Sequence, residues 1–497
     1  MQKSPKSPML LQVNTRVWLT ELSGRLNRRV TLDDIPDRAL DEFTENGFDW
    51  IWLLSVWQTG SAARSISRSN PGWRREFEAT LPDLKEEDIA GSGFAIQGYT
   101  VHRDLGGDAA LGRLRKRMQQ RGLRLMLDFV PNHLAPDHPW VTDHPEYFIH
   151  GTEEDLLREP QNYGRAHSKN GPLVLALGRD PFFDGWPDTF QLDYGNPELQ
   201  TAMISELARI ADQCDGLRCD MAMLALPDVF ERTWGSTIEP FWPKAMDAVR
   251  KTHPGFLFLG EVYWNLEWTM QQQGFDFTYD KSLYDRLRSH QTGSVREHLE
   301  AEMDYQDKLV RFLENHDEHR AAAAFEREAH KAAAIITFLS PGMRFFHQGQ
   351  FEGHQRRISP HLARGPVEEV DEDLHTFYKR LLTVLENNTV RNGSWQQLEC
   401  VPVWEGNRTN SGFIGFGWSM LDGDRLIAVV NYSPLRSQCY LKLPGAELVQ
   451  NQWQLSDLMH EMTYMRDGDD LTHRGLFLDL PPWEYHVFRL EKAAPPA

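Results

Sequence analysis

The chain of 497 residues has little cysteine and no long apolar run. Its four cysteines are too few for a disulfide framework in a chain of this length, and Cys214 and Cys219 lack the spacing of a metal-binding pair. No stretch approaches the roughly eighteen apolar residues of a membrane-spanning helix. These absences argue against a disulfide-stabilised scaffold and against an integral membrane protein.

Basic residues are also scarce, since 53 Lys and Arg stand against 72 Asp and Glu, which gives a net charge of −19. This negative surplus repels phosphate backbones and anionic lipids, so we expect neither a nucleic-acid partner nor a membrane partner. Residues 1–19 contain lysines but only a short apolar patch at Met9-Leu10-Leu11. Such a segment is a poor signal peptide, and a cytoplasmic location is therefore expected.

Short apolar runs separated by longer helical patterns recur over about the first 390 residues. Each run has the length of a strand and is rich in β-branched or aromatic residues, as in strands buried on both faces. Eight strands alternating with helices predict an α/β fold of the (β/α)8 TIM barrel type. The runs are Val13–Leu19, Trp50–Leu54, Leu123–Phe129, Gly216–Met221, Phe256–Val262, Gly274–Tyr279, Leu309–Leu313 and Met343–His347.

Helix signals fill the intervals between these runs. Asn196-Pro197-Glu198 supplies an N-cap, a first-turn proline and an acidic residue for a helix that reaches about Asp212. Leu111–Arg121, Ala321–Ala334 and Asp371–Glu386 are predicted as further helices. A doubly wound open sheet is the competing topology, but the glycine-rich phosphate loop that usually follows its first strand is missing.

Two connections are longer than ordinary turns, namely 55–106 after the second strand and 134–193 after the third. After about Ser394, strand-like runs follow one another without long helices, as in an antiparallel sandwich. These runs are Phe413–Met420, Arg425–Tyr432, Gln438–Leu443 and Leu476–Leu490. We predict a catalytic barrel of residues 1–133 and 194–394, an excursion domain of 134–193 and a C-terminal antiparallel β-sandwich of 395–497.

Carboxylates follow several predicted strands at the barrel end where active sites form. The fourth strand ends Arg218-Cys219-Asp220, and the fifth ends with Glu261. Side chains alternate along a strand, so Arg218 and Asp220 share a face, where the cation would keep Asp220 ionised as a nucleophile requires. Glu261, with a raised pKa, would be the partner that protonates a leaving group.

Two carboxylates facing one cleft without a metal-ligand cluster indicate glycoside chemistry. At a separation of about 5–5.5 Å they would act with retention, through a covalent glycosyl-enzyme. A third carboxylate, Asp317, follows the seventh strand and would bind sugar hydroxyls in the oxocarbenium-like transition state.

Four segments, in this order along the chain, resemble the conserved regions of the α-amylase family, glycoside hydrolase family 13. They are Asp128–His133, Gly216–Asp220, Glu261–Tyr263 and Phe312–Asp317, and Gly98-Tyr99 and Gly342–Gly349 also fit. The resemblance covers the whole barrel and, more loosely, the terminal sandwich. It implies an α-glucan, malto-oligosaccharide or small α-glucoside as substrate and no cofactor for the chemistry.

The resemblance also implies a role for each site residue. Asp220 would be the nucleophile, Glu261 the general acid/base and Asp317 the transition-state stabiliser. The implied sugar-binding residues are Arg218, which orients Asp220, His133 and His316, which hydrogen-bond the sugar at the cleavage point, and Tyr99, which stacks beneath it. Asn132 resembles a calcium ligand of the family, and this leaves a structural calcium open.

The tryptophans fall into two sets. Those on loops or strand ends are candidates for stacking on sugars, although packing of the long loops explains each of them equally well. This set is Trp57, Trp73, Trp140, Trp186 and Trp264, of which Trp186 and Trp264 are assigned to substrate binding. Trp18, Trp50 and Trp52 lie within predicted strands and are expected in the core.

One departure from the family pattern bears on the reaction. Many amylases have a lysine and a histidine three and four residues after the nucleophile, on the leaving-group side, where this chain has Met223 and Leu224. We expect a less polar leaving-group subsite, or one built from elsewhere. Besides retaining hydrolysis, this leaves open a transglycosylase or an α-glucoside isomerase. A carbohydrate-binding barrel without catalysis is the remote alternative, and the oligomeric state is unknown.

Overall fold

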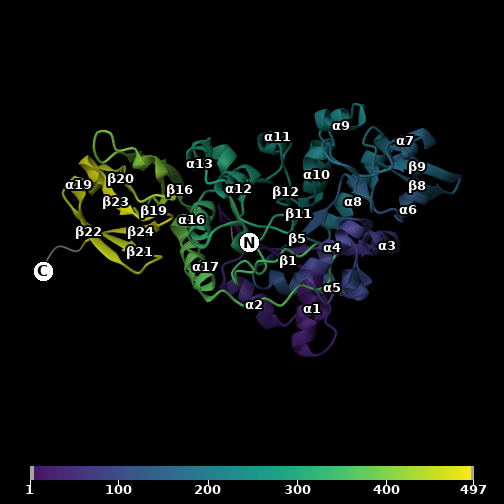
Figure 1. The fold of residues 1–497 in the computed structure, drawn as a ribbon, viewed down its shortest axis with the longest axis horizontal. Helices are drawn as coiled ribbons and strands as arrows, with labels where there is room; N and C mark the ends of the chain where they lie inside the picture. Colours follow the sequence, from purple (N-terminus) through teal and green to yellow (C-terminus); the bar gives the residue numbers. More distant parts are fainter. Residues whose placement is uncertain (1–4, 422, 494–497) are drawn as a thin grey trace. The chain divides into compact units, whose positions relative to one another are not determined.

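A computed structural model describes residues 5–421 and 423–493. Eight strands form a closed barrel whose spatial order follows the chain, and neighbouring strands pair in parallel (Figure 1). The strands are β1 (Met9–Asn14), β2 (Trp50–Leu54), β5 (Arg124–Phe129), β11 (Gly216–Cys219), β12 (Leu257–Gly260), β13 (Phe277–Tyr279), β14 (Leu309–Arg311) and β15 (Met343–His347). The prediction of a (β/α)8 barrel is confirmed.

The first strand lies earlier than its predicted position at Val13–Leu19. Strand β1 consists of Met9–Asn14 and includes the apolar patch that was interpreted as a poor signal peptide. The Asn14 side chain accepts a hydrogen bond from the Val17 amide and so begins helix α1, Thr15–Leu26. Trp18 is therefore a helical residue, although it is buried in the core as expected.

Two other predicted segments are each divided in the structure. The predicted helix at Ala321–Ala334 consists of α15 (Ala321–Ala324) and α16 (Arg327–Phe338), which are separated by Phe325 in extended conformation with its side chain buried. The predicted strand Leu476–Leu490 is interrupted at Pro481 and Pro482, because proline cannot donate a ladder hydrogen bond. It consists of β23 (Leu476–Leu480) and β24 (Tyr485–Lys492).

The capped helices were predicted correctly. Helix α8 is Pro197–Ala211, with the Asn196 side chain as its N-cap, and α17 is Glu372–Leu385, capped by Asp371. Helix α5, Gly107–Gln119, begins four residues before its predicted start.

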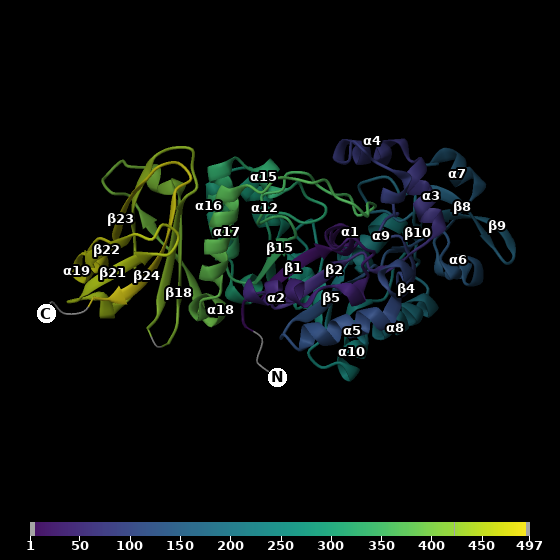
Figure 2. The ribbon, with the colours of Figure 1, turned by 90° about the horizontal axis from the view of Figure 1, so that it is seen from below.

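One compact unit consists of Leu11–Tyr279 and Arg356–Val367. The connection after β2 contains β3 (Trp57–Thr59), α3 (Ser61–Ser69), α4 (Pro71–Thr80) and β4 (Ile96–Val101). The connection after β5 contains a three-stranded sheet in which β9 (Gly171–Ala176) lies between β7 (His150–Gly151) and β8 (Tyr163–Ser168). Strands β8 and β9 are labelled in Figure 2. Both long connections therefore have secondary structure of their own.

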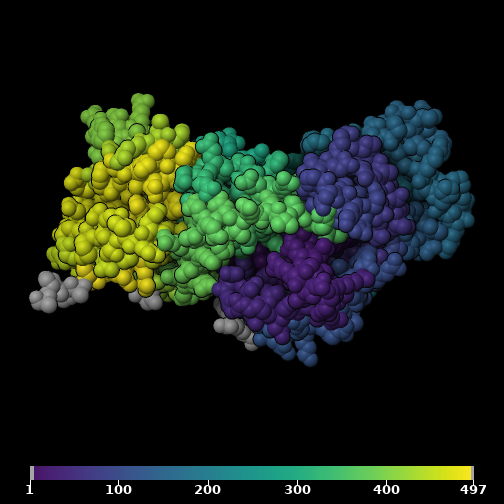
Figure 3. Space-filling model, turned by 60° about the horizontal axis from the view of Figure 1, so that its bottom comes forward, coloured from purple at the N-terminus to yellow at the C-terminus, as the bar shows by residue number. Residues whose placement is uncertain are grey.

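The other compact unit consists of the residues up to Leu10, Asp280–Gln355 and Glu368 onward. Its C-terminal part forms two antiparallel sheets and gives the yellow surface in Figure 3. One sheet has six strands in the order β16-β18-β19-β24-β21-β22, and the other has three in the order β17-β20-β23. Leucine side chains from both sheets, including Leu441, Leu455 and Leu478, share one core. The strands not yet given are β16 (Ser394–Leu398), β17 (Cys400–Val401), β18 (Phe413–Ser419), β19 (Arg425–Asn431), β20 (Ser437–Leu441), β21 (Gln452–Asp457) and β22 (Thr463–Asp467).

Within the described residues, no helix combines the length and apolar character needed to cross a bilayer. The three predicted domain boundaries stay a prediction.

Candidate active site

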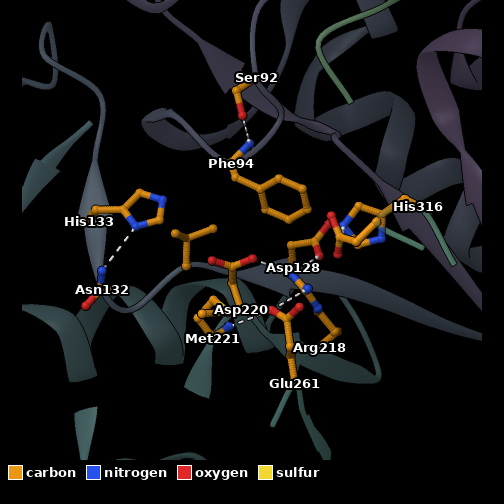
Figure 4. A network of polar contacts seen from close by, with 12 residues as sticks. Ser92, Phe94, Asp128, Asn132, His133, Arg218, Asp220, Met221, Glu261 and His316 are labelled. Carbon is orange, nitrogen blue, oxygen red and sulfur yellow. Dashed lines mark hydrogen bonds and ion pairs between the residues drawn. The ribbon is translucent and has the colours of Figure 1, made fainter. Parts of the chain in front are cut away.

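The register of three neighbouring strands gathers the site on one face of the sheet. Arg218 in β11 lies opposite Asp128 in β5, and beyond the strand ends the Glu261 amide still donates to the Cys219 carbonyl at 3.0 Å. Asp220 and Glu261 therefore follow β11 and β12 at adjacent positions, with Arg218 between their side chains (Figure 4).

Arg218 binds both predicted catalytic carboxylates of this unit. Its Nη1 lies 2.6 Å from Asp220 Oδ1, and its Nη2 lies 2.6 Å from Glu261 Oε2. Asp128 Oδ1 lies 3.7 Å from Nη1. The guanidinium is fully buried, so these charge-assisted contacts are shielded from solvent. The predicted pairing of Arg218 with Asp220 is present, and the contact with Glu261 is an addition that the sequence did not indicate.

Aromatic rings surround the same guanidinium. Its central carbon lies 5.2 Å from the ring centres of both Trp52 and Phe94 and 5.9 Å from that of Tyr279. Trp52 is buried as predicted, whereas Phe94 is half-buried and stands over the carboxylates in Figure 4. Phe94 was not predicted, because it precedes β4 in an irregular loop without hydrophobic periodicity.

Three carboxyl groups around one guanidinium leave a surplus of negative charge in a buried place. Burial raises the pKa of Asp220 to about 8, against the lowering effect of Arg218, and the charge of Glu261 raises it further. Burial likewise raises the pKa of Asp128 to about 7. The raised pKa of Asp220 contradicts the expectation that Arg218 keeps this carboxylate ionised, because burial of the group outweighs the attraction of the cation.

Glu261 has a fixed position. Its Oε2 accepts a hydrogen bond from the Met221 amide at 2.7 Å, and its Oε1 accepts one from the Tyr263 hydroxyl at 2.8 Å. Met221 itself adopts a left-handed conformation with φ of 41°. A residue other than glycine in this conformation carries a small strain, here directly after the predicted nucleophile.

The structure places the predicted sugar-binding residues of this unit in different environments. Burial lowers the pKa of His133 to about 3, so its imidazole is neutral, and its ring lies 5.0 Å from that of Trp186. Tyr99 is only 2% exposed, and its hydroxyl donates to the Val130 carbonyl at 3.0 Å. Its ring packs between Trp57 and Phe129, so stacking of Tyr99 beneath a sugar stays a prediction.

Trp264 belongs to an aromatic group that includes residues the sequence did not point to. Its ring lies 5.0 Å from that of Phe182, and the guanidinium of Arg232 covers both rings. The Phe182 side chain is 58% exposed and that of Phe183 is 72% exposed. Large exposed apolar side chains beside a half-buried tryptophan form a surface suited to ligands.

Three of the other loop tryptophans pack within the protein. Trp57 is 1% exposed and donates to the Asp128 carbonyl at 2.7 Å, so the interpretation of Trp57 as an open sugar platform is wrong. The Trp73 ring lies 4.5 Å from the His361 ring, and the Trp140 ring lies 5.3 Å from that of Tyr147.

Met223 and Leu224, in place of the polar family residues, are buried in a short 3-10 helix, Ala222–Ala225. The Trp242 indole fixes this turn through a 2.9 Å hydrogen bond to the Ala222 carbonyl. These positions therefore offer no polar group to a ligand.

Asn132 does not fit a calcium ion. Its Oδ1 accepts a 3.0 Å hydrogen bond from Gln191, and its Nδ2 lies 3.4 Å from the His133 ring nitrogen. A calcium ion requires six to eight free oxygen ligands, whereas this oxygen is engaged among neutral side chains. We derive no role for calcium here.

The compact unit that contains β14 presents Asp317. Asn315 Oδ1 accepts hydrogen bonds from the amides of Asp317 and Glu318 at 2.8 and 2.9 Å, which closes a tight turn. The side chain of Asp317 is 42% exposed, and His316 Nε2 lies 3.1 Å from its Oδ2. The two predicted residues of this turn are thus adjacent.

The base of this turn is a buried ion pair that the sequence did not predict. Glu314 Oε1 lies 3.1 Å from Arg320 Nη2, and burial raises the pKa of Glu314 to about 7. Arg320 also donates to the Gln348 carbonyl at 3.0 Å. The turn that carries Asp317 is therefore held by both of its ends.

Comparison with known proteins gives α-amylases and maltosyltransferases among the relatives. An α-amylase MalA from Haloarcula japonica is 26% identical over 358 residues, which are 70% of this chain and 45% of that protein. An α-1,4-glucan:maltose-1-phosphate maltosyltransferase from Salinibacter ruber is 24% identical over 503 residues, 94% of this chain and 66% of that protein. The chain thus spans about half to two thirds of the length of these curated relatives.

Solved structures show the same fold. The crystal structure of an α-amylase from Lactobacillus plantarum superposes with a TM-score of 0.67 at 21% identity, over 97% of this chain and 99% of that one. The family model for the α-amylase catalytic domain matches residues 38–399. These residues include every predicted catalytic and sugar-binding position, and the chain belongs to the α-amylase catalytic-domain family.

Proposed function

We propose that this protein is a retaining α-glycosidase that cleaves α-glucosidic bonds in α-glucans, malto-oligosaccharides or small α-glucosides. The observation that carries the proposal is the Arg218 guanidinium, which binds Asp220 and Glu261 through two neighbouring nitrogens, each at 2.6 Å. A shared cation keeps the two carboxylates close together, which favours the short separation typical of retaining enzymes.

In the first step, an Asp220 oxygen attacks the anomeric carbon, and the bond to the leaving oxygen breaks as Glu261 donates its proton to that oxygen. In the second step, Glu261 removes a proton from water, whose oxygen attacks the same carbon and displaces Asp220. Asp317 is proposed to bind sugar hydroxyls in the transition state.

The remaining assignments concern sugar binding. His133 and His316 are proposed to hydrogen-bond the sugar at the cleavage point, with Tyr99, Trp186 and Trp264 as stacking surfaces. A neutral imidazole at His133 offers both a donor and an acceptor to hydroxyl groups. A cytoplasmic location stays a prediction from the sequence.

The second candidate is transfer of the glycosyl group to a sugar instead of water, by a transglycosylase or an isomerase. The exposed Phe182 favours it, because an exposed aromatic ring can stack on an acceptor sugar. Met223 and Leu224, which are buried, leave the polar family residues without a counterpart. The relative from Salinibacter ruber is named a maltosyltransferase, and this name supports glycosyl transfer as a candidate. A binding protein without catalysis is less well supported, because all three acids are present.

The test is incubation with malto-oligosaccharides, sucrose and trehalose, followed by chromatography of the products and NMR of the first-formed anomer. We expect α-configured products from wild type and a loss of at least a thousandfold in Asp220→Asn, while the exposed Asp228→Asn control stays active. Longer or isomerised sugars would identify transfer. Equal product from wild type and Asp220→Asn, or a β-configured first product, would overturn the proposal.

A covalent trap gives an independent result. A 5-fluoro-α-glucosyl fluoride should label the peptide that contains Asp220 in wild type, and mass spectrometry locates the added sugar. Label on another carboxylate would contradict the assignment of the nucleophile.

A further inference from the structure

A cluster of one carboxylate and two imidazoles lies in the C-terminal sheet, and it has no part in the proposed reaction. Strand β21 ends at Asp457, which pairs with Phe488 of β24, so that His486 lies next to it across the ladder. His460 comes back to the same point through the turn that follows Asp457. Within residues 5–421 and 423–493, this is the one group of three ligand atoms from His, Cys, Asp or Glu close enough to hold a metal ion.

Both imidazoles direct the same kind of atom at one oxygen. His460 Nδ1 lies 3.0 Å from Asp457 Oδ2, and His486 Nδ1 lies 2.6 Å from it. The other oxygen, Oδ1, is held by the backbone, since it accepts from the Met459 amide at 3.0 Å and from the His460 and Val487 amides at 3.4 Å. Oδ2 is thus the single carboxylate oxygen turned toward the rings, as in a monodentate metal ligand whose orientation is fixed by hydrogen bonds.

The far nitrogen of His460 faces a second carboxylate. His460 Nε2 lies 3.3 Å from Glu484 Oε1. A carboxylate behind the far nitrogen of a ligating histidine is a recurring feature of metal sites in proteins.

The surroundings of the cluster are apolar on one side and open on the other. The His486 ring stacks on Phe488 at 4.9 Å, and the His460 ring lies 5.1 Å from that of Tyr485. The Asp457 side chain is fully buried, whereas that of His460 is 34% exposed. An ion could enter from the side of His460 and take a water molecule as a further ligand.

We propose that Asp457, His460 and His486 form a binding site for a divalent transition-metal ion, Zn²⁺ in the first place. Two nitrogens, one carboxylate oxygen and a water molecule are a donor set that zinc accepts in tetrahedral geometry. Ligands at about 2.0–2.1 Å from zinc lie roughly 3.3 Å from one another, so the contacts of His460 and His486 to Oδ2 would lengthen by about 0.3 and about 0.7 Å. The ion would tie the turn after β21 to β24, and this inference does not depend on the proposed reaction.

The test uses the full-length protein after treatment with a chelator. Titration with Zn²⁺ in a calorimeter should give one ion bound per chain, and the melting temperature should rise with zinc concentration. Co²⁺ in place of zinc should give the intense visible absorption of tetrahedral coordination. His460→Gln and His486→Gln should each lose binding at least a hundredfold, while His473→Gln, an exposed histidine of the same sheet region, should bind as wild type does.

Glu484→Gln keeps all three ligands and weakens only the support behind His460, and we expect zinc binding to be reduced 10–100-fold. This variant decides the question if a histidine variant fails to fold, as judged by circular dichroism without metal. No binding by wild type at a hundredfold excess of zinc, or undiminished binding by both folded histidine variants, would overturn the proposal. If the histidine variants do not fold, undiminished zinc binding by Glu484→Gln would overturn the proposal.

Discussion

Replacing Arg218 by glutamine removes the cation that binds the carboxyl cluster while retaining much of its volume. The guanidinium contacts Asp220 and Glu261 at 2.6 Å in a fully buried place. The interaction of two unit charges about 4 Å apart at an effective dielectric constant of about 20 is worth about 4 kcal/mol. Since 1.36 kcal/mol corresponds to one pKa unit, loss of the cation should raise the pKa of Asp220 by about three units.

The assay is the dependence of kcat/KM on pH with 4-nitrophenyl α-glucoside. Its leaving group needs no protonation, so the rate reports the ionisation of the nucleophile alone. At pH 7 we expect Arg218→Gln to lose about a thousandfold, and its activity to rise tenfold with each pH unit up to about pH 11. Arg218→Lys keeps the charge and loses one charged hydrogen bond, about 1.5–3 kcal/mol, so it should lose only ten- to a hundredfold.

The rising pH profile separates this explanation from a general loss of structure. A variant that is merely misfolded would lose activity equally at every pH. The reasoning is refuted if folded Arg218→Gln keeps more than a third of the wild-type kcat/KM at pH 7, or if its activity does not recover as the pH rises.

Three further predictions concern other groups. With malto-oligosaccharides, wild-type kcat/KM should rise as the pH increases toward about 8, because burial raises the pKa of the proposed nucleophile Asp220 to about 8 and the nucleophile must be ionised; a flat profile from pH 6 to 8 would contradict this. Phe94→Ala should lower kcat/KM about tenfold, because a cation–π contact of about 1–2 kcal/mol is lost, and Phe94→Tyr should restore it. Asp280→Asn leaves Arg311 buried without its counter-charge, so it should lower the free energy of unfolding by about 3–5 kcal/mol in urea titrations. The exposed Asp285→Asn should change that free energy by less than about 0.5 kcal/mol. Burial alone would raise the pKa of Asp280, but His298 and Arg311 hold it below its usual range. The difference in unfolding free energy between wild type and Asp280→Asn should therefore shrink as the pH falls toward that lowered pKa. Equal losses in Asp280→Asn and Asp285→Asn at pH 7 would contradict the role of Asp280 as counter-charge of Arg311.

The barrel could be predicted because its strands are apolar on both faces. Trp50–Leu54 and Met343–His347 have the predicted bounds, since each run is entirely buried and flanked by polar residues or glycine. The first strand was misplaced because Val17 and Trp18 continue an apolar run across the Asn14 cap into a buried helix. Strand β22 was missed because its residues are exposed or half-buried and carry no strong alternation.

Only those contacts of the site that lie within a single strand could be predicted from the sequence. Arg218 and Asp220 lie two residues apart, so the period of a strand places them on one face. The contact of Arg218 with Glu261 depends on the register between β11 and β12, which no local pattern contains. The Asp457 cluster likewise depends on the pairing of β21 with β24.

The turn after Asp220 holds the proposed nucleophile and the proposed acid/base close to one another. Met221 has a φ of 41°, and its amide donates to Glu261 Oε2 at 2.7 Å. The same oxygen is bound by Arg218, whose other nitrogen holds Asp220. Glu261 is thus fixed to the backbone of the nucleophile strand as well as to its side chains. The distance between the two carboxylates is then set by backbone conformation and one buried guanidinium, so that neither carboxylate needs to be positioned by the substrate.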